Sequence, residues 1–93
     1  VQPGDQCLVI GLGGVGLSVI QGLRSRGASM IIGVDRDERK FPLAKAMGAT
    51  HLLSDTTELA AQVQAMTGGG VEWSFECVGH TGLMRAALEA GHK

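Results

Sequence analysis

The stretch Cys7–Ile20, CLVIGLGGVGLSVI, places four glycines between two apolar segments. The run Gln6–Gly11 is short, apolar and bounded by glycine, which predicts a buried strand. Apolar residues then recur at helical spacing, at Val15, Val19, Ile20 and Leu23. The pattern Gly11-x-Gly13-x-x-Gly16 therefore lies where a strand passes into a helix, the setting in which such glycines bind the pyrophosphate of a dinucleotide.

Each glycine of this pattern has a mechanical role in that interpretation. Gly11 allows the tight turn, Gly13 leaves room for the pyrophosphate, and Gly16 lets the helix pack closely on the strand. The unpaired N–H groups at the start of the helix attract the phosphates. The alternative for the motif alone is an ordinary glycine-rich turn. The residues predicted to bind the cofactor in this loop are Gly11, Leu12, Gly13, Gly14, Val15 and Gly16.

Strands and helices alternate along the rest of the chain. Further strands are predicted at Met30–Val34, His51–Leu53 and Val71–Val78, each followed by a helix. The order βαβαβαβα predicts an α/β fold, a partial, doubly wound parallel sheet of the Rossmann type with about four strands and helices on both faces. Residues 1–93 are expected to form one incomplete dinucleotide-binding domain, and the ends of the sequence suggest a segment of a longer chain.

Two of the predicted helices have distinctive residues at their start. Pro42 lies inside the charged segment that follows Asp37, so the helix either begins near Phe41 or has an irregular first turn. Asp55 followed by Glu58 resembles a capping box, which predicts a helix start at that point.

An acidic residue follows the second predicted strand at the distance that a dinucleotide site requires. Asp35 lies 19 residues after Gly16 and is predicted to accept hydrogen bonds from the hydroxyls of the adenosine ribose. Its charge repels a 2′-phosphate, which favours NAD over NADP. Arg36 favours the opposite if it pairs with that phosphate; stacking on adenine or simple solvation are its alternatives. Lys40 is a candidate for the same ribose, or a solvated lysine.

The composition excludes several classes of function. The net charge of −1 predicts no binding to nucleic acid or to an anionic membrane, and no apolar run is long enough to span a bilayer. Cys7 and Cys77 fall in apolar runs and predict buried thiols in a reducing compartment, the cytoplasm. The spacing of cysteines and histidines assembles no zinc site, and no Gly-Lys-Ser/Thr follows the glycines as in a P-loop.

Two other functions remain open from the residues alone. A methyltransferase that uses S-adenosylmethionine also combines a strand, a glycine loop and a helix with an acid after the second strand. A non-catalytic module that senses nucleotides is the other alternative. Closer agreement with the GxGxxG spacing favours the dinucleotide.

Three segments carry a resemblance to a known family: PGDQCLVIGLGGVGLSVIQG (3–22), IIGVDRDERKFPLAKAMGAT (31–50) and MTGGGVEWSFECVGHTGLMRAALEAGHK (66–93). They resemble the coenzyme domain of zinc-containing medium-chain alcohol dehydrogenases, most closely the class III branch of glutathione-dependent formaldehyde dehydrogenases. The likeness extends over nearly the whole chain.

The resemblance implies a division of labour between this segment and the rest of such an enzyme. NAD would lie on the glycine loop, with Asp35 and Lys40 at the adenosine ribose and Val78 against the cofactor. The zinc ligands and the catalytic residues of the family come from other segments, so no catalytic or metal-binding residue is expected here and the segment alone is expected to be inert. The whole enzyme would be a homo-oligomer that oxidises an alcohol or an S-hydroxymethyl thiol by hydride transfer to NAD.

Overall fold

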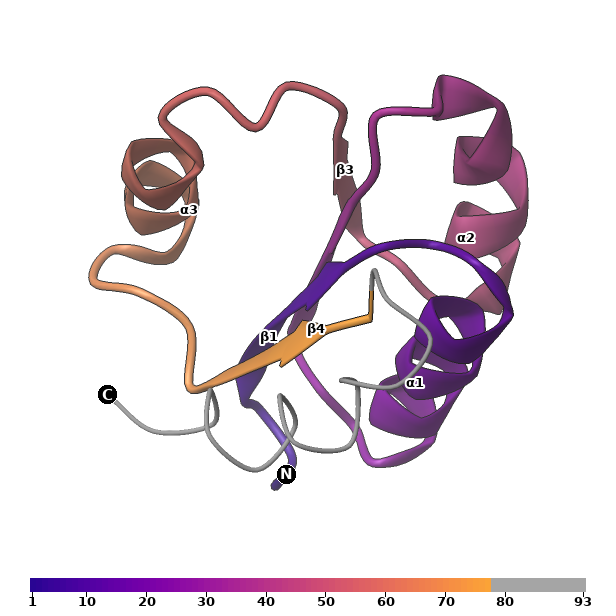
Figure 1. Cartoon of the computed structure of the whole chain (residues 1–93). Coiled ribbons are helices and arrows are strands. Elements are labelled where there is room, and N and C mark those ends of the chain that lie inside the picture. Colours follow the sequence, from indigo (N-terminus) through magenta and orange to yellow (C-terminus); the bar gives the residue numbers. More distant parts are fainter. Residues whose placement is uncertain (78–93) are drawn as a thin grey trace.

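Four parallel strands form the centre of the chain in a computed structural model, which describes residues 1–77 (Figure 1). The predicted residue Val78 and the helix predicted over Thr81–Ala90 lie outside the described residues. In chain order the elements are strand β1 (Gln6–Ile10), helix α1 (Gly14–Ser25), strand β2 (Met30–Val34), the short 3₁₀ helix η1 (Glu38–Lys40), helix α2 (Phe41–Met47), strand β3 (His51–Leu53), helix α3 (Leu59–Thr67) and strand β4 (Trp73–Glu76).

The strands lie in the order β3-β2-β1-β4, and all neighbours are parallel. Within the sheet, β2 and β3 lie on one side of β1, and the chain then crosses back so that β4 pairs with the other edge of β1. The order therefore reverses at β1, where open parallel sheets bind ligands beyond the carboxyl ends of their strands. The register aligns Ile10 with Val34 on one side and with Glu76 on the other, so these ends form a common edge.

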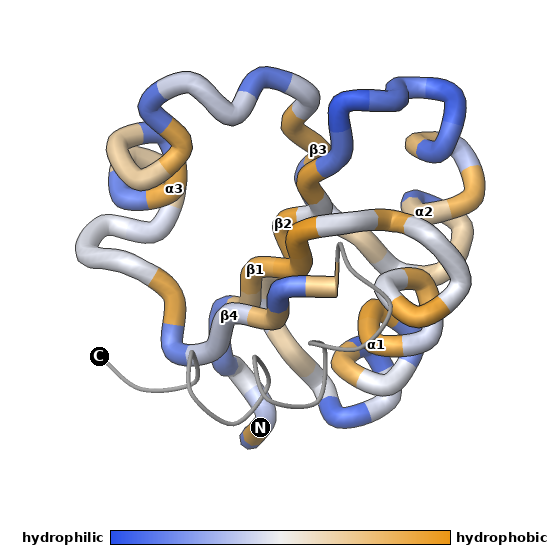
Figure 2. Tube along the Cα trace, viewed as in Figure 1, coloured by the Kyte–Doolittle hydropathy of each residue, from blue (hydrophilic) through white to orange (hydrophobic). Residues whose placement is uncertain are grey.

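Helices cover both faces of the sheet, as predicted. In Figure 1 α1 and α2 lie on one side of the strands and α3 on the other. Cys7 and Val9 of β1 belong to the apolar cluster on the α1 and α2 face, whereas Leu8 joins Val63 of α3 in the opposite cluster. Because side chains alternate along a strand, burial on both faces requires the continuous apolar run seen in β1. Figure 2 shows the resulting hydrophobic band along β1 and β2.

The start of α2 resolves the question that Pro42 raised. Asp37 caps η1 by accepting a hydrogen bond from the Arg39 amide, and α2 begins at Phe41 with Pro42 in its first turn. Proline is tolerated there because an amide in the first turn has no partner within the helix. Of the two alternatives for this segment, a helix that begins near Phe41 is therefore confirmed.

The capping box expected at Asp55 and Glu58 is wrong. The Asp55 carboxylate accepts a hydrogen bond from the Thr57 amide, which forms a turn, and α3 begins only at Leu59. Glu58 precedes the helix in a left-handed conformation (φ 57°) and makes no capping bond with its side chain. Local bonding of an aspartate to the backbone two residues further on competes with capping, and here it delays the helix.

Candidate functional site

A cavity of about 610 Å³ opens at the carboxyl edge of the sheet, where the strand order reverses. Its volume lies in the range of small-molecule sites. The loop after β1, the connection after β2, the loop after β3 and the end of β4 all contribute to its wall. The lining residues are Ile10, Gly11, Gly13, Val34, Asp35, Arg36, Lys40, Thr56 and Cys77.

The glycine loop has the geometry that its spacing predicts. Gly11 has a φ of +98°, a conformation that other residues rarely adopt, and this turns the chain sharply out of β1. A Cβ atom placed on Gly16 would lie 1.8 Å from the Gly11 carbonyl oxygen, so α1 can approach the end of β1 only with glycine at this position. A Cβ atom on Gly13 would meet no atom within 4 Å, and Gly13 lines the cavity. The space beside Gly13 is therefore open at the cavity.

The remaining residues of the loop are placed in different ways. The Leu12 side chain is buried in the core on the α1 face, and its amide donates to Asp35. Gly14 and Val15 are exposed in the first turn of α1. The amides at the start of a helix have no partner within the helix, and they carry the positive end of its dipole. This first turn can bind an anion with its backbone.

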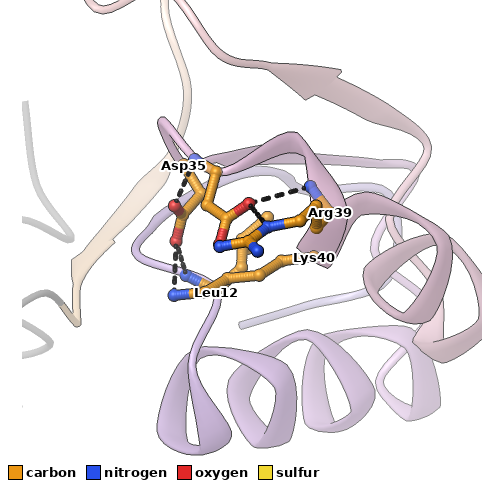
Figure 3. Close-up of polar contacts among 5 residues, drawn as sticks. Leu12, Asp35, Arg39 and Lys40 are labelled. Atoms are coloured by element: carbon orange, nitrogen blue, oxygen red, sulfur yellow. Dashed lines mark hydrogen bonds and ion pairs between the residues drawn. The ribbon is translucent and has the colours of Figure 1, made fainter.

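Asp35 brings a negative charge to the cavity directly after β2. Its Oδ2 atom accepts hydrogen bonds from the Leu12 amide (2.9 Å) and from Lys40 Nζ (3.4 Å), and its Oδ1 atom accepts one from the Asp37 amide (2.8 Å), as Figure 3 shows. Burial opposes ionisation of this carboxyl, but the two amides and the Lys40 ammonium outweigh burial and lower its pKa below the ordinary 3.8. Asp35 is therefore a carboxylate at neutral pH.

The cations that follow Asp35 differ in their partners. Arg39 pairs with Asp37 (Nε to Oδ1, 2.9 Å), and Lys40 pairs with Asp35. Arg36 is exposed, lines the cavity and makes no ion pair within residues 1–77. Figure 2 shows this connection between β2 and α2 as a hydrophilic segment beside the hydrophobic strands.

The structure brings together most of the predicted cofactor residues that it describes. Gly11, Gly13, Asp35, Arg36 and Lys40 line one cavity, although the glycine loop and the acidic connection are separated in the sequence. These assignments to a cofactor remain predictions.

Sequence reasoning missed Thr56 in the wall of the cavity. The available signal was topological, because Thr56 follows β3 and every loop after a parallel strand emerges at the same edge. Cys77 was predicted to be a buried thiol, but in the structure it is half-buried after β4 and lines the cavity.

Both cysteines are free thiols in the structure. Burial, together with the nearby Asp5 and Glu72 carboxylates, raises the pKa of the Cys7 thiol to about 11. Burial also raises the pKa of Cys77. Neither thiol is ionised at neutral pH, so neither is a nucleophile.

Within residues 1–77, no group of three or more histidine, cysteine, aspartate or glutamate side chains is arranged to hold a metal ion. Over the same residues, no helix has the length and apolar character needed to cross a membrane.

Comparison with known proteins identifies the class to which this fold and site belong. A family model described as zinc-binding dehydrogenase matches residues 14–93. The chain therefore belongs to the zinc-binding dehydrogenase family, which confirms the resemblance found in the sequence.

Two curated relatives resemble the chain over its whole length. It is 50% identical to S-(hydroxymethyl)glutathione dehydrogenase of Synechocystis sp., and it covers 26% of that protein. It is 47% identical to alcohol dehydrogenase class-3 of Myxine glutinosa, of which it also covers 26%. The chain thus spans about a quarter of the length of the curated relatives it matches.

The fold agrees with solved structures of the same kind. Benzyl alcohol dehydrogenase from Acinetobacter calcoaceticus superposes with a TM-score of 0.77 at 38% identity, over 98% of this chain and 24% of that one. The alcohol dehydrogenase TADH from Thermus sp. ATN1 gives a TM-score of 0.77 at 31% identity, over 99% and 28%. The partial Rossmann-type sheet predicted from the sequence is confirmed.

Proposed function

We propose that residues 1–93 form the NAD-binding part of a zinc-dependent alcohol dehydrogenase. One observation carries the proposal: the ionised Asp35 carboxylate lines the same cavity as Gly11 and Gly13 of the glycine loop. A carboxylate and a phosphate-binding loop at one strand edge match the two ends of an adenosine diphosphate group. Membership of the dehydrogenase family supports this use of the site.

The residues of this chain fit a dinucleotide at each point that the structure allows us to test. The space beside Gly13 is open, and the amides of the first turn of α1 are available to the pyrophosphate. Asp35 would accept hydrogen bonds from the adenosine ribose, with Lys40 beside it. Val78 is proposed to lie against the cofactor. When bound, NAD supplies the acceptor for a hydride ion.

The charge of Asp35 favours NAD over NADP. A 2′-phosphate on the ribose would lie close to this carboxylate, and like charges in contact are costly. Lys40 and Arg39 are already paired with carboxylates, which leaves Arg36 as the cation of this connection without an ion pair in the described part of the chain. We propose that Arg36 contributes to the adenosine end of the site without reversing the preference for NAD.

The whole protein would oxidise an alcohol or an S-hydroxymethyl thiol. The names of the two curated relatives, an S-(hydroxymethyl)glutathione dehydrogenase and a class-3 alcohol dehydrogenase, support this substrate class. As the resemblance implies, the zinc of the family would be bound by segments other than this one; residues 1–77 offer no group of three such ligands. Substrate binding and hydride transfer therefore need the rest of the protein.

The location and assembly of the whole protein are also proposals. The free thiols Cys7 and Cys77 support a reducing compartment, the cytoplasm. The outer edge of β4 has no neighbouring strand among residues 1–77. Exposed strand edges are usually covered, and we propose that further strands and a second copy of the protein do so in a homo-oligomer.

Calorimetric titration of the full-length protein with NAD, NADP and S-adenosylhomocysteine tests the proposal. We expect NAD to bind about 10-fold more tightly than NADP, because of the charge of Asp35, and S-adenosylhomocysteine not to compete. Tighter binding of S-adenosylhomocysteine would indicate a methyltransferase. Binding of NAD without reduction of it by any alcohol or S-hydroxymethyl thiol would indicate a module that only senses nucleotides.

A further inference from the structure

The carboxylate of Asp35 is bonded to the glycine loop as well as facing the cavity. The Leu12 amide donates to Oδ2 over 2.9 Å, across a separation of 23 residues in the sequence (Figure 3). The Asp35 side chain is only 14% exposed, so water competes weakly for this bond. Asp35, which is proposed to bind the ribose, is thus already hydrogen-bonded to the loop that is proposed to bind the phosphates.

A second bond fixes the neighbouring residue of the loop to the same strand end. The Gly11 amide donates to the Val34 carbonyl oxygen over 2.7 Å, directly before the Leu12 bond. Two consecutive amides are therefore held by the end of β2. The amides that follow, at the start of α1, have no partner within the helix and remain available to a ligand.

We infer that Asp35 is a positioning residue for the phosphate-binding loop, which it holds through the Leu12 amide in addition to binding the ribose. This inference rests on the proposed dinucleotide site. It couples the two halves of that site, because the residue that binds the adenosine end also sets the direction of the loop at the pyrophosphate end. Preorganised donors bind a ligand more tightly because less ordering is required when it arrives.

The chemistry of a carboxylate suits this role in a way that an amide cannot match. Two backbone donors, the amides of Leu12 and Asp37, face the two oxygen atoms of Asp35. Asparagine has the same size but only one acceptor oxygen, and its NH₂ group would face one of the two N–H donors. Asp35→Asn therefore loses a hydrogen bond in either orientation of the side chain.

Asp37→Asn provides a matched control. It makes the same chemical change two residues further along the chain. The Asp37 side chain binds Arg39, not the glycine loop, and it does not line the cavity. Both variants remove one negative charge. An effect on the loop that is seen in Asp35→Asn but not in Asp37→Asn is therefore due to the position of the Asp35 carboxylate and not to the loss of a charge.

Hydrogen exchange in the ligand-free, full-length protein tests the inference directly. Mass spectrometry of peptides that contain Leu12 should show about 10-fold faster exchange of its amide in Asp35→Ala, which has no acceptor oxygen in any orientation; this is the size expected for one lost hydrogen bond. Asp35→Asn should show the same change when its NH₂ group faces Leu12. Asp37→Asn and Asp37→Ala should leave this rate unchanged. A wild-type rate at Leu12 in Asp35→Ala would overturn the inference.

A second measurement covers the possibility that the Asp35 variants do not fold, which faster exchange in α2 would reveal. In wild-type protein labelled with ¹⁵N-leucine, the Leu12 amide resonance should shift as Asp35 is protonated in acid. The Leu17 amide, which donates to the Gly13 carbonyl oxygen, should not follow this titration. A Leu12 resonance that does not titrate would contradict the bond and overturn the inference.

Binding of inorganic pyrophosphate separates positioning from ribose binding, because this ligand has no ribose. Removal of a negative charge near the site by itself strengthens the binding of an anion. A loop that has lost its support predicts the opposite, about 3-fold weaker binding of pyrophosphate in Asp35→Ala, which has no acceptor for the Leu12 amide. Unchanged or stronger binding would contradict the positioning role. Failure of wild-type protein to bind NAD would instead refute the proposed function, and the exchange experiment would remain valid.

Discussion

The loop after β1 and the connection after β2 meet at one edge of the sheet but contribute different chemistry. Gly11, Gly13 and Gly16 contribute a sharp turn, open space and close packing, all of which depend on the lack of a side chain. Asp35 and Lys40 contribute charged side chains. A phosphate site can thus be built from backbone alone, whereas selection of the ribose needs a side chain, and the bond from Leu12 to Asp35 joins the two.

The largest effect is expected at Gly16, where the loop depends on close packing. Gly16→Ala places a methyl group 1.8 Å from the Gly11 carbonyl oxygen, so the loop or α1 must shift. We expect the free energy of unfolding to fall by about 3 kcal/mol, the upper range for overpacking. Urea unfolding of the full-length protein measures the change.

Gly14→Ala is the control for that experiment. A Cβ atom on Gly14 meets nothing within 4 Å. Its effect on the free energy of unfolding should stay within about 1 kcal/mol, because helix propensity alone changes. Equal effects of Gly16→Ala and Gly14→Ala would show that the close approach of α1 to β1 does not constrain the loop.

The second largest effect is expected at Gly13, where a substitution should weaken binding of NAD without lowering the stability of the fold. Gly13 has a φ of −76°, which alanine adopts readily, and the space beside it is open. Gly13→Ala should therefore leave stability within about 1 kcal/mol of wild type but should lower NAD affinity about 10-fold, because the methyl group occupies the phosphate position. Calorimetry with NAD measures the affinity.

Gly22→Ala is the matched control, because it lies in α1 away from the cavity and its Cβ atom also meets nothing within 4 Å. It should bind NAD like the wild-type protein. Wild-type affinity in Gly13→Ala would show that the open space beside Gly13 is not the phosphate position.

The contribution of Asp35 to the free energy of unfolding should depend on pH. Hydrogen bonds lower the pKa of Asp35 in the folded state, so the folded state prefers the carboxylate. This stabilisation is complete well above the ordinary pKa of 3.8 and is lost as the pH falls through the lower value of the folded state. The difference in stability between wild type and Asp35→Asn should therefore be constant near neutral pH and should narrow in acid. Urea unfolding at several pH values measures this difference. A difference that does not change with pH would contradict a lowered pKa of Asp35 in the folded state.

The smallest effect is expected at Lys40, whose ion pair with Asp35 is long and partly exposed to water. The side chain of Lys40 is 43% exposed, and Nζ lies 3.4 Å from Oδ2. Lys40→Met should lower NAD affinity only about 2- to 3-fold, as for a weak surface ion pair. Lys45→Met, an exposed position on α2 that does not line the cavity, is the control and should change nothing. A loss as large as that of Gly13→Ala would mean that Lys40 contributes more than a peripheral charge.

Much of the fold could be predicted because the signals are local. The bounds of β2 and β3 match the apolar runs Met30–Val34 and His51–Leu53, and the glycine spacing predicted the turn and the close packing. The start of α3 could not be predicted, because Asp55 bonds to the backbone of its own turn. The Leu12–Asp35 hydrogen bond could not be predicted from the sequence either, because it depends on the register of β1 with β2.

A crystal structure of the full-length protein with NAD tests the central claim most directly. The account predicts the pyrophosphate at the amides of the first turn of α1, next to Gly13, and a hydroxyl of the adenosine ribose on Asp35. It also predicts that the Leu12 amide still donates to Asp35 in the complex. A dinucleotide bound outside the cavity, or one whose ribose does not contact Asp35, would contradict the account.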